Sequence, residues 1–262
     1  TDMYQLAADQ FWGREAGTLD ELKVSMWFAD KMKDAGMKPA GDNGTFFQFF
    51  DMYRHQISPQ SSVKIGDKSL KLWKDILVQD VTDNQFTAPV LYLGKAEPEE
   101  LANKNIAGKI VALKASDLNI KKEMTLFVRR YPGFVRNKYY KELVRLGAKG
   151  IIFITDDISD KSWVEVVPQM TRGTYGIEGI REKVDTGIPV FWIKQENENW
   201  VKNNPEISLN IQTENYKYPS VNIIGKIEGT DPKLKNEYVL LSGHQDHDGI
   251  RHPVKNDTIY NG

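Results

Sequence analysis

The sequence predicts an α/β protein in which helices alternate with the strands of a mixed sheet. Residues 2–36 place apolar side chains at helical spacing, with lysine and aspartate between them. Residues 137–146 form an amphipathic pattern that stops at Gly147 and leads into the apolar stretch 150–155, which is typical of a helix followed by a buried strand. Other short apolar or alternating stretches predict further strands, at residues 46–53, 87–94, 106–114, 187–193, 221–227 and 238–241.

The first helical region is expected to divide into two helices near the glycines of residues 13–17. Thr18 and Glu21 have the spacing of a capping box, in which Thr18 is the N-cap of the second helix. Gly36 is expected just beyond the end of that helix, where glycine accepts a left-handed conformation. We interpret Arg14 as part of a surface turn, with binding of a carboxylate as the alternative.

Aromatic side chains dominate the predicted strand at residues 46–53, and we expect this stripe to belong to the core. His55 follows it and is interpreted as a surface or partly buried strand-end histidine. The polar stretch 59–62 predicts a domain boundary, since composition changes there.

The block that follows the boundary has its own pattern of strands and helices. Residues 97–102 predict a short helix with acidic side chains in its first turn. Residues 156–175 are expected to be long and irregular, either as a peptide-contacting loop or as a packed excursion. The acidic and lysine side chains of the block are scattered, which is typical of a solvated surface and predicts no catalytic group in it.

Composition excludes several kinds of site and partner. The 262 residues contain no cysteine, so disulfides and thiolate metal sites are absent. A net charge of −1 gives no electrostatic basis for binding nucleic acid or an anionic membrane. No apolar run reaches the roughly 18 residues that a membrane-spanning helix needs.

The strongest candidate for chemistry lies near the end of the sequence. Residues 229–232 predict a turn, and residues 238–241 predict a buried strand that leads through Gly243 into a loop. His244 and Asp246 follow two residues apart, so an extended backbone would point both side chains the same way. A carboxylate beside an imidazole fixes the tautomer and raises the basicity of a metal-binding histidine. A His-x-Asp pair by itself is weak evidence, and loop residues without a catalytic role are the alternative.

A longer stretch resembles one protein family. Residues 220–249 followed by 256–262 carry an asparagine-containing strand, a Gly-Thr-Asp-Pro turn, the His-Gln-Asp-His loop and a closing Asn261-Gly262 in the order typical of zinc-dependent aminopeptidases with a two-metal site. This resemblance is to the aminopeptidase Y and glutamate carboxypeptidase type. It implies an α/β fold, the amino-terminal part of a mixed-sheet zinc exopeptidase domain of the phosphorylase/hydrolase-like class.

The resemblance also implies a role for the candidate pair. His244 would bind one of two Zn²⁺ ions, and Asp246 would act in catalysis by orienting that histidine. The family's bridging aspartate follows the landmark matched by Asn261-Gly262, and its general-base glutamate and remaining ligands come later still. We therefore expect the remainder of the catalytic domain to follow Gly262, and without it the strand 238–241 would present an unpaired apolar edge.

Three other residues near the pair are not expected to bind metal. His247 lies off the face of His244 on an extended backbone, and the resemblance does not make it a ligand. His252 and Asp257 are interpreted as loop residues, with Asp257 supporting the turn before Asn261. One imidazole and one orienting carboxylate fall short of the three or more protein ligands that zinc sites use.

The middle block resembles the protease-associated domain that is often inserted in such peptidases. The resemblance depends on the order and spacing of 108–111, 146–152, Asp156 and 188–190. The expected organisation is a metallopeptidase domain at residues 1–62 and 213–262, interrupted by a protease-associated α/β insert at residues 63–212.

The resemblance implies an exopeptidase that removes amino-terminal residues from peptides, and a secreted or periplasmic location. The alternative is a non-catalytic module that binds peptides or proteins on a degenerate peptidase scaffold. The presence of both His244 and Asp246 favours the enzyme, because an inactive scaffold does not need the pair.

Overall fold

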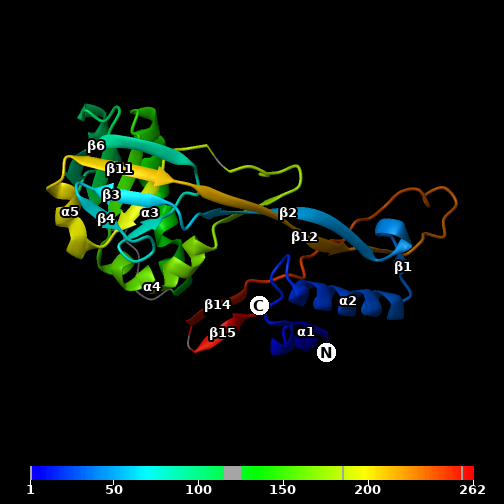
Figure 1. The fold of residues 1–262 in the computed structure, drawn as a ribbon. Helices are drawn as coiled ribbons and strands as arrows, with labels where there is room; N and C mark the ends of the chain where they lie inside the picture. Colours follow the sequence, from blue (N-terminus) through cyan, green and yellow to red (C-terminus); the bar gives the residue numbers. More distant parts are fainter. Residues whose placement is uncertain (1, 115–124, 185, 255) are drawn as a thin grey trace. The chain divides into compact units, whose positions relative to one another are not determined.

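The computed structural model describes residues 2–114, 125–184, 186–254 and 256–262 and divides the chain into two compact units. Unit 1 comprises residues 1–53, 176–182 and 217–262, and unit 2 comprises residues 54–175 and 183–216. The chain passes between them within three strands of one sheet, ordered β12–β2–β9. These strands are β2 (Phe47–Ile57), β9 (Thr174–Ile177) and β12 (Thr213–Ile223) (Figure 1).

Unit 1 holds the amino-terminal helices and the last part of the chain. Its helical elements are α1 (Asp2–Leu6), η1 (Asp9–Phe11), α2 (Leu19–Asp34) and η2 (Asp42–Gly44). Its own strands form two antiparallel pairs: β1 (Lys38–Pro39) with β13 (Gly225–Lys226), and β14 (Gly249–Val254) with β15 (Asp257–Tyr260).

The start of α2 confirms the predicted cap. The side-chain oxygen of Thr18 accepts a hydrogen bond from the backbone N–H of Glu21 at 3.2 Å. The reciprocal half of the capping box differs, because the Glu21 carboxylate accepts from the N–H of Gly17 rather than from that of Thr18. Gly36 has φ = +77° just beyond the helix, as predicted.

Unit 2 is built around an eight-stranded mixed sheet with the order β4–β3–β11–β6–β7–β8–β10–β5. The pairs β6–β7, β7–β8 and β8–β10 are parallel, and the remaining pairs are antiparallel. The strands are β3 (Ser62–Ile65), β4 (Lys68–Leu70), β5 (Ile76–Val78), β6 (Asn84–Gly94), β7 (Ile110–Lys114), β8 (Gly150–Ile154), β10 (Val190–Ile193) and β11 (Glu206–Ile211). The helical elements are η3 (Pro98–Asn103), α3 (Thr125–Arg145), α4 (Asp157–Thr171), η4 (Gln195–Asn197) and α5 (Glu198–Lys202).

Alternation along the central strands divides the core of unit 2 into two layers. On β8, Ile152 and Ile154 belong to one buried cluster, whereas Ile151 and Phe153 belong to the other. The second cluster also contains buried side chains of α3 and α4, so these helices cover that face of the sheet (Figure 1). Side chains two residues apart share a face, and this periodicity explains why the strands are apolar throughout.

Several sequence-based expectations are wrong in the structure. Residues 156–175 are not irregular, because Asp156 caps α4 by accepting from the N–H of Ser159 at 2.9 Å. The aromatic stripe of β2 is not core, since Phe49 is exposed and borders a shallow groove against α2. His252 and Asp257 lie in the hairpin strands β14 and β15 rather than in a loop.

The predicted buried strand at residues 238–241 is also wrong. Tyr238 to Leu241 are between 85% and 91% exposed and belong to no strand. A strand is stable only when its backbone pairs with a neighbour, and no strand of the described structure pairs with this stretch. Local β propensity therefore does not produce a strand here.

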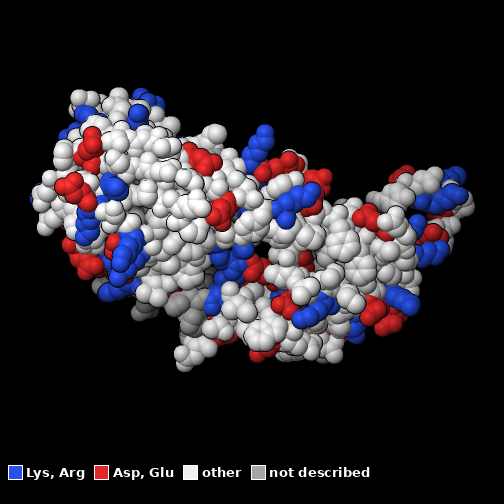
Figure 2. Space-filling model, viewed as in Figure 1, with Lys and Arg blue, Asp and Glu red and all other residues white. Residues whose placement is uncertain are grey.

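The face of the molecule in Figure 2 carries acidic and basic side chains interspersed over both units, without a large field of one sign. Within the part of the chain that the structure describes, no helix combines the length and apolar character needed to cross a bilayer.

Candidate functional site

The loop that contains His244 and Asp246 lies in unit 1 and brings the two side chains together. His244 Nδ1 is 3.5 Å from Asp246 Oδ1 and 2.9 Å from the backbone oxygen of Asp246. A carbonyl oxygen can only accept, so Nδ1 carries the proton and Nε2 keeps its lone pair. The side chains are 78% and 41% exposed, and Nε2 therefore belongs to a ring that solvent reaches.

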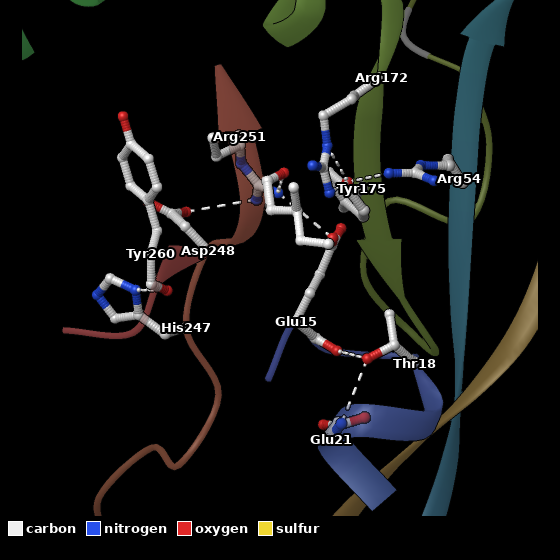
Figure 3. A network of polar contacts seen from close by, with 11 residues as sticks. Glu15, Thr18, Glu21, Arg54, Arg172, Tyr175, His247, Asp248, Arg251 and Tyr260 are labelled. Atoms are coloured by element: carbon white, nitrogen blue, oxygen red, sulfur yellow. Dashed lines mark hydrogen bonds and ion pairs between the residues drawn. The ribbon is translucent and has the colours of Figure 1, made fainter. Parts of the chain in front are cut away.

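His247 has the same tautomer but a different setting. Its Nδ1 donates to the backbone oxygen of Tyr260 at 2.7 Å, which fixes the ring against β15 (Figure 3). Asp257, on the same strand, accepts a hydrogen bond from the N–H of Ile259 at 3.0 Å. These contacts stabilise the hairpin end of the chain and do not involve the His244–Asp246 pair.

Arg14 is not the surface-turn residue that the sequence suggested. It is 6% exposed and has φ = +41°, a left-handed conformation that is uncommon for arginine. Its Nε donates to the backbone oxygen of Gln245 at 2.6 Å, and Nη1 donates to that of Leu6 at 3.0 Å. Burial lowers the pKa of Arg14, and the charge of Asp246 opposes that change.

The backbone next to Arg14 also pairs with the loop. The N–H of Gly249 donates to Gly13 O at 3.0 Å, and the N–H of His247 donates to Arg14 O at 3.2 Å. Gly13 has φ = +71°, and a Cβ there would lie 2.7 Å from Cα of Gly249 and from Tyr260 O. Only glycine permits this approach of two backbones.

An ion-pair group borders the same contact. Arg251 on β14 lies 3.3 Å from Glu15 and 3.5 Å from Asp248, as Figure 3 shows. The amino-terminal segment and the loop are thus joined by backbone pairing and by side-chain charge.

Glu21 is a second buried charged group of unit 1. Its carboxylate accepts from the N–H of Gly17 and from the hydroxyl of Ser220, both at 2.7 Å. Burial raises the pKa of Glu21, and these two hydrogen bonds oppose the rise. The carboxylate connects the start of α2 with β12.

A zinc site needs at least three protein ligands, and the metal-binding side chains of the structure can be compared with that number. Among the described residues, no group of three or more histidine, aspartate or glutamate side chains is placed to hold a metal ion. The pair itself fits the chemistry of one ligand, because His244 presents Nε2 while Asp246 holds the opposite nitrogen. These residues can therefore supply one imidazole ligand and its orienting acid.

Comparison with known proteins gives structural neighbours only. No protein-family model matches the sequence, and no curated protein sequence matches it.

The fold is similar to three solved peptidases. An aminopeptidase from Aneurinibacillus sp. strain AM-1 is 19% identical over 88% of this chain and 49% of its own, with a TM-score of 0.49. A zinc aminopeptidase from Bacillus subtilis is 16% identical over 88% of this chain and 47% of its own, with a TM-score of 0.41. A peptidase M28 precursor from Shewanella amazonensis SB2B is 15% identical over 87% of this chain and 54% of its own, with a TM-score of 0.38. The chain spans about half the length of these solved structures.

Proposed function

We propose that this chain belongs to a zinc-dependent exopeptidase that removes amino-terminal residues from peptides, and that His244 is one ligand of its dinuclear zinc site. The observation that carries the proposal is the pairing of His244 Nδ1 with Asp246 on an exposed ring, an arrangement that leaves Nε2 of a neutral imidazole available to a metal. The ordered landmarks of residues 220–262 support the same assignment.

Asp246 is the orienting residue in this proposal. Its backbone oxygen accepts the hydrogen bond from His244 Nδ1, and its carboxylate lies 3.5 Å from the same nitrogen, which orients the ring and raises the electron density available at Nε2. When bound, a zinc pair would polarise the scissile carbonyl and lower the pKa of the attacking water.

Residues 63–212, most of which belong to unit 2, are proposed to be a protease-associated domain that interrupts a metallopeptidase domain. Its support is the order of the segments 108–111, 146–152 and 188–190, which form or adjoin the parallel strands β7, β8 and β10. A secreted or periplasmic location is proposed because the resemblance to the zinc aminopeptidase family implies it.

The proposal is tested by zinc-dependent release of amino acids from aminoacyl chromogenic substrates by the intact protein. His244→Gln is expected to abolish that release and to reduce zinc bound per protein in equilibrium dialysis. Asp246→Asn is expected to lower zinc affinity or activity by about 10- to 100-fold, because it alters the partner of the ligand rather than the ligand. His252→Gln serves as the histidine control and is expected to retain activity.

Two results would contradict the proposal. Full activity in His244→Gln would remove this histidine from the site. Peptide binding by the wild-type protein without any zinc-dependent hydrolysis would instead identify a binding module on a peptidase-like scaffold.

A further inference from the structure

Gln245 stands between the two residues of the candidate site and faces the opposite way. His244 and Asp246 are directed toward solvent, whereas the Gln245 side chain reaches α2 and donates from Nε2 to Ser25 Oγ at 2.7 Å. Contacts that hold Gln245 can thus restrict the positions of His244 and Asp246, the residues on either side of it in the sequence.

Both the side chain and the backbone of Gln245 make hydrogen bonds. The Ser25 hydroxyl donates to the backbone oxygen of Glu21 at 2.8 Å, so its oxygen is free to accept the Gln245 amide. The backbone oxygen of Gln245 accepts from Arg14 Nε at 2.6 Å, which fixes the peptide that joins it to Asp246. A bond from a charged donor that is buried is stronger than one between neutral groups in water.

The loop has few other supports. Among the described residues, 237–248 belong to no helix or strand, and the stretch from Tyr238 to Leu241 is exposed. The hydrogen bonds from Arg14 and to Ser25 hold the middle of the loop, next to the candidate pair. The end of the loop is held by the backbone pairing of residues 13 and 14 and by the contacts of His247 and Asp248.

We propose that Arg14 and Ser25 are positioning residues, which hold Gln245 and thereby keep His244 and Asp246 at bonding distance. The relevance of this arrangement to zinc rests on the proposed function. The positioning itself is a property of this chain and is measurable without metal, substrate or activity.

The test is nuclear magnetic resonance of the histidine rings in isotope-labelled full chain, at one fixed pH where the rings are neutral. The sequence has four histidines, so their ring signals are few enough to assign. In the wild-type protein His244 is expected to show the Nδ1–H tautomer, which free histidine disfavours. Arg14→Gln and Ser25→Ala are each expected to remove most of that signature and to return His244 to the tautomer mixture of free histidine.

Matched control variants distinguish loss of positioning from loss of folding. Ser25→Thr keeps a hydroxyl and is expected to retain the wild-type tautomer. Arg145→Gln removes an exposed arginine that pairs with Glu142 and is expected to have no effect on His244. The buried ring of His55, bonded to Asn215 at 2.6 Å in unit 2, reports whether that unit stays folded. Far-UV circular dichroism reports whether the helices of both units stay folded.

An unchanged His244 tautomer in folded Arg14→Gln and Ser25→Ala would overturn the proposal. If Ser25→Ala fails to fold, Gln245→Ala removes the same side-chain contact from the loop side and keeps the backbone oxygen that accepts from Arg14, and an unchanged His244 signature there would overturn the role of Ser25. Loss of the tautomer in these variants, from a wild-type protein that shows no peptidase activity, would uphold the positioning and reject only the proposed function.

Discussion

Glu21 illustrates at the residue scale how a buried charge in unit 1 is tolerated. Its carboxylate is almost inaccessible, and hydrogen bonds from Gly17 and Ser220 replace part of the water that it loses. Burial still dominates, and the pKa of Glu21 is raised above its ordinary value of 4.5. The folded state therefore holds the Glu21 proton more tightly than the unfolded state does.

The raised pKa of Glu21 determines how the free energy of unfolding changes with pH, because the folded and unfolded states bind the Glu21 proton with different affinity. A group whose pKa is raised on folding contributes stability that is fully present below the unfolded pKa and is lost as pH rises through the folded pKa. We expect the contribution of Glu21 to decrease as pH rises above about 4.5, and Glu21→Gln to remove this decrease. Denaturant unfolding of the two proteins at a series of pH values measures the difference.

Asp20→Asn is the matched control, because Asp20 lies in the same helical turn and pairs with Lys23 at the surface. It is expected to leave the Glu21-dependent slope in place. A wild-type protein that gains stability relative to Glu21→Gln as pH rises would contradict the assignment.

In the candidate site, one contact could be predicted from the sequence alone and another could not. His244 and Asp246 lie two residues apart, so the contact between them is local in the sequence. The burial of Arg14 depends on Gln245, which is 231 positions away in the sequence. No local pattern around Arg14 predicts that contact, and the interpretation as a surface turn was wrong for this reason.

For single helices and strands, predictions that depend on local sequence signals are correct more often than those that depend on contacts with distant residues. The strands β7, β8 and β10 agree with the predicted strands because continuous apolar runs are local signals. Helical spacing at residues 137–146 predicted only the second part of α3. The helix α4 differs from the expectation that residues 156–175 are irregular, although Asp156 is a residue type that favours the N-cap. The stretch 238–241 has the composition of a strand but lacks a paired neighbour in the described structure.

The N-cap of α2 gives a prediction at this scale. Thr18→Ala removes the acceptor for the N–H of Glu21 and is expected to lower the free energy of unfolding by about 1 kcal/mol. Thr18→Ser keeps the acceptor oxygen and is expected to change stability by much less. Thermal and urea unfolding of the three proteins give the comparison, and equal losses in the two variants would show that the cap does not matter.

For the molecule as a whole, the apolar core is distributed unevenly between the two units. Both large buried clusters lie in unit 2, on the two faces of its sheet. The buried apolar side chains of unit 1 described in the structure are fewer: Phe11, Val24, Ala29, Met52 and Val221. Since burial of apolar surface is the main stabilising contribution, unit 2 is expected to resist opening more strongly than unit 1.

Amide hydrogen exchange of the intact chain measures this difference along the sequence. The amides of β7, β8 and β10 are hydrogen-bonded inside the sheet and are expected to exchange only when unit 2 unfolds. The amides of residues 238–241 are expected to exchange at rates close to those of an unstructured peptide, because the stretch is exposed and belongs to no strand. The amides of His247 and Gly249 should lie between these limits, since they donate to the backbone oxygens of Arg14 and Gly13. Slow exchange at residues 238–241 would show that this stretch pairs as a strand in solution, and it would restore the interpretation that its sequence first suggested.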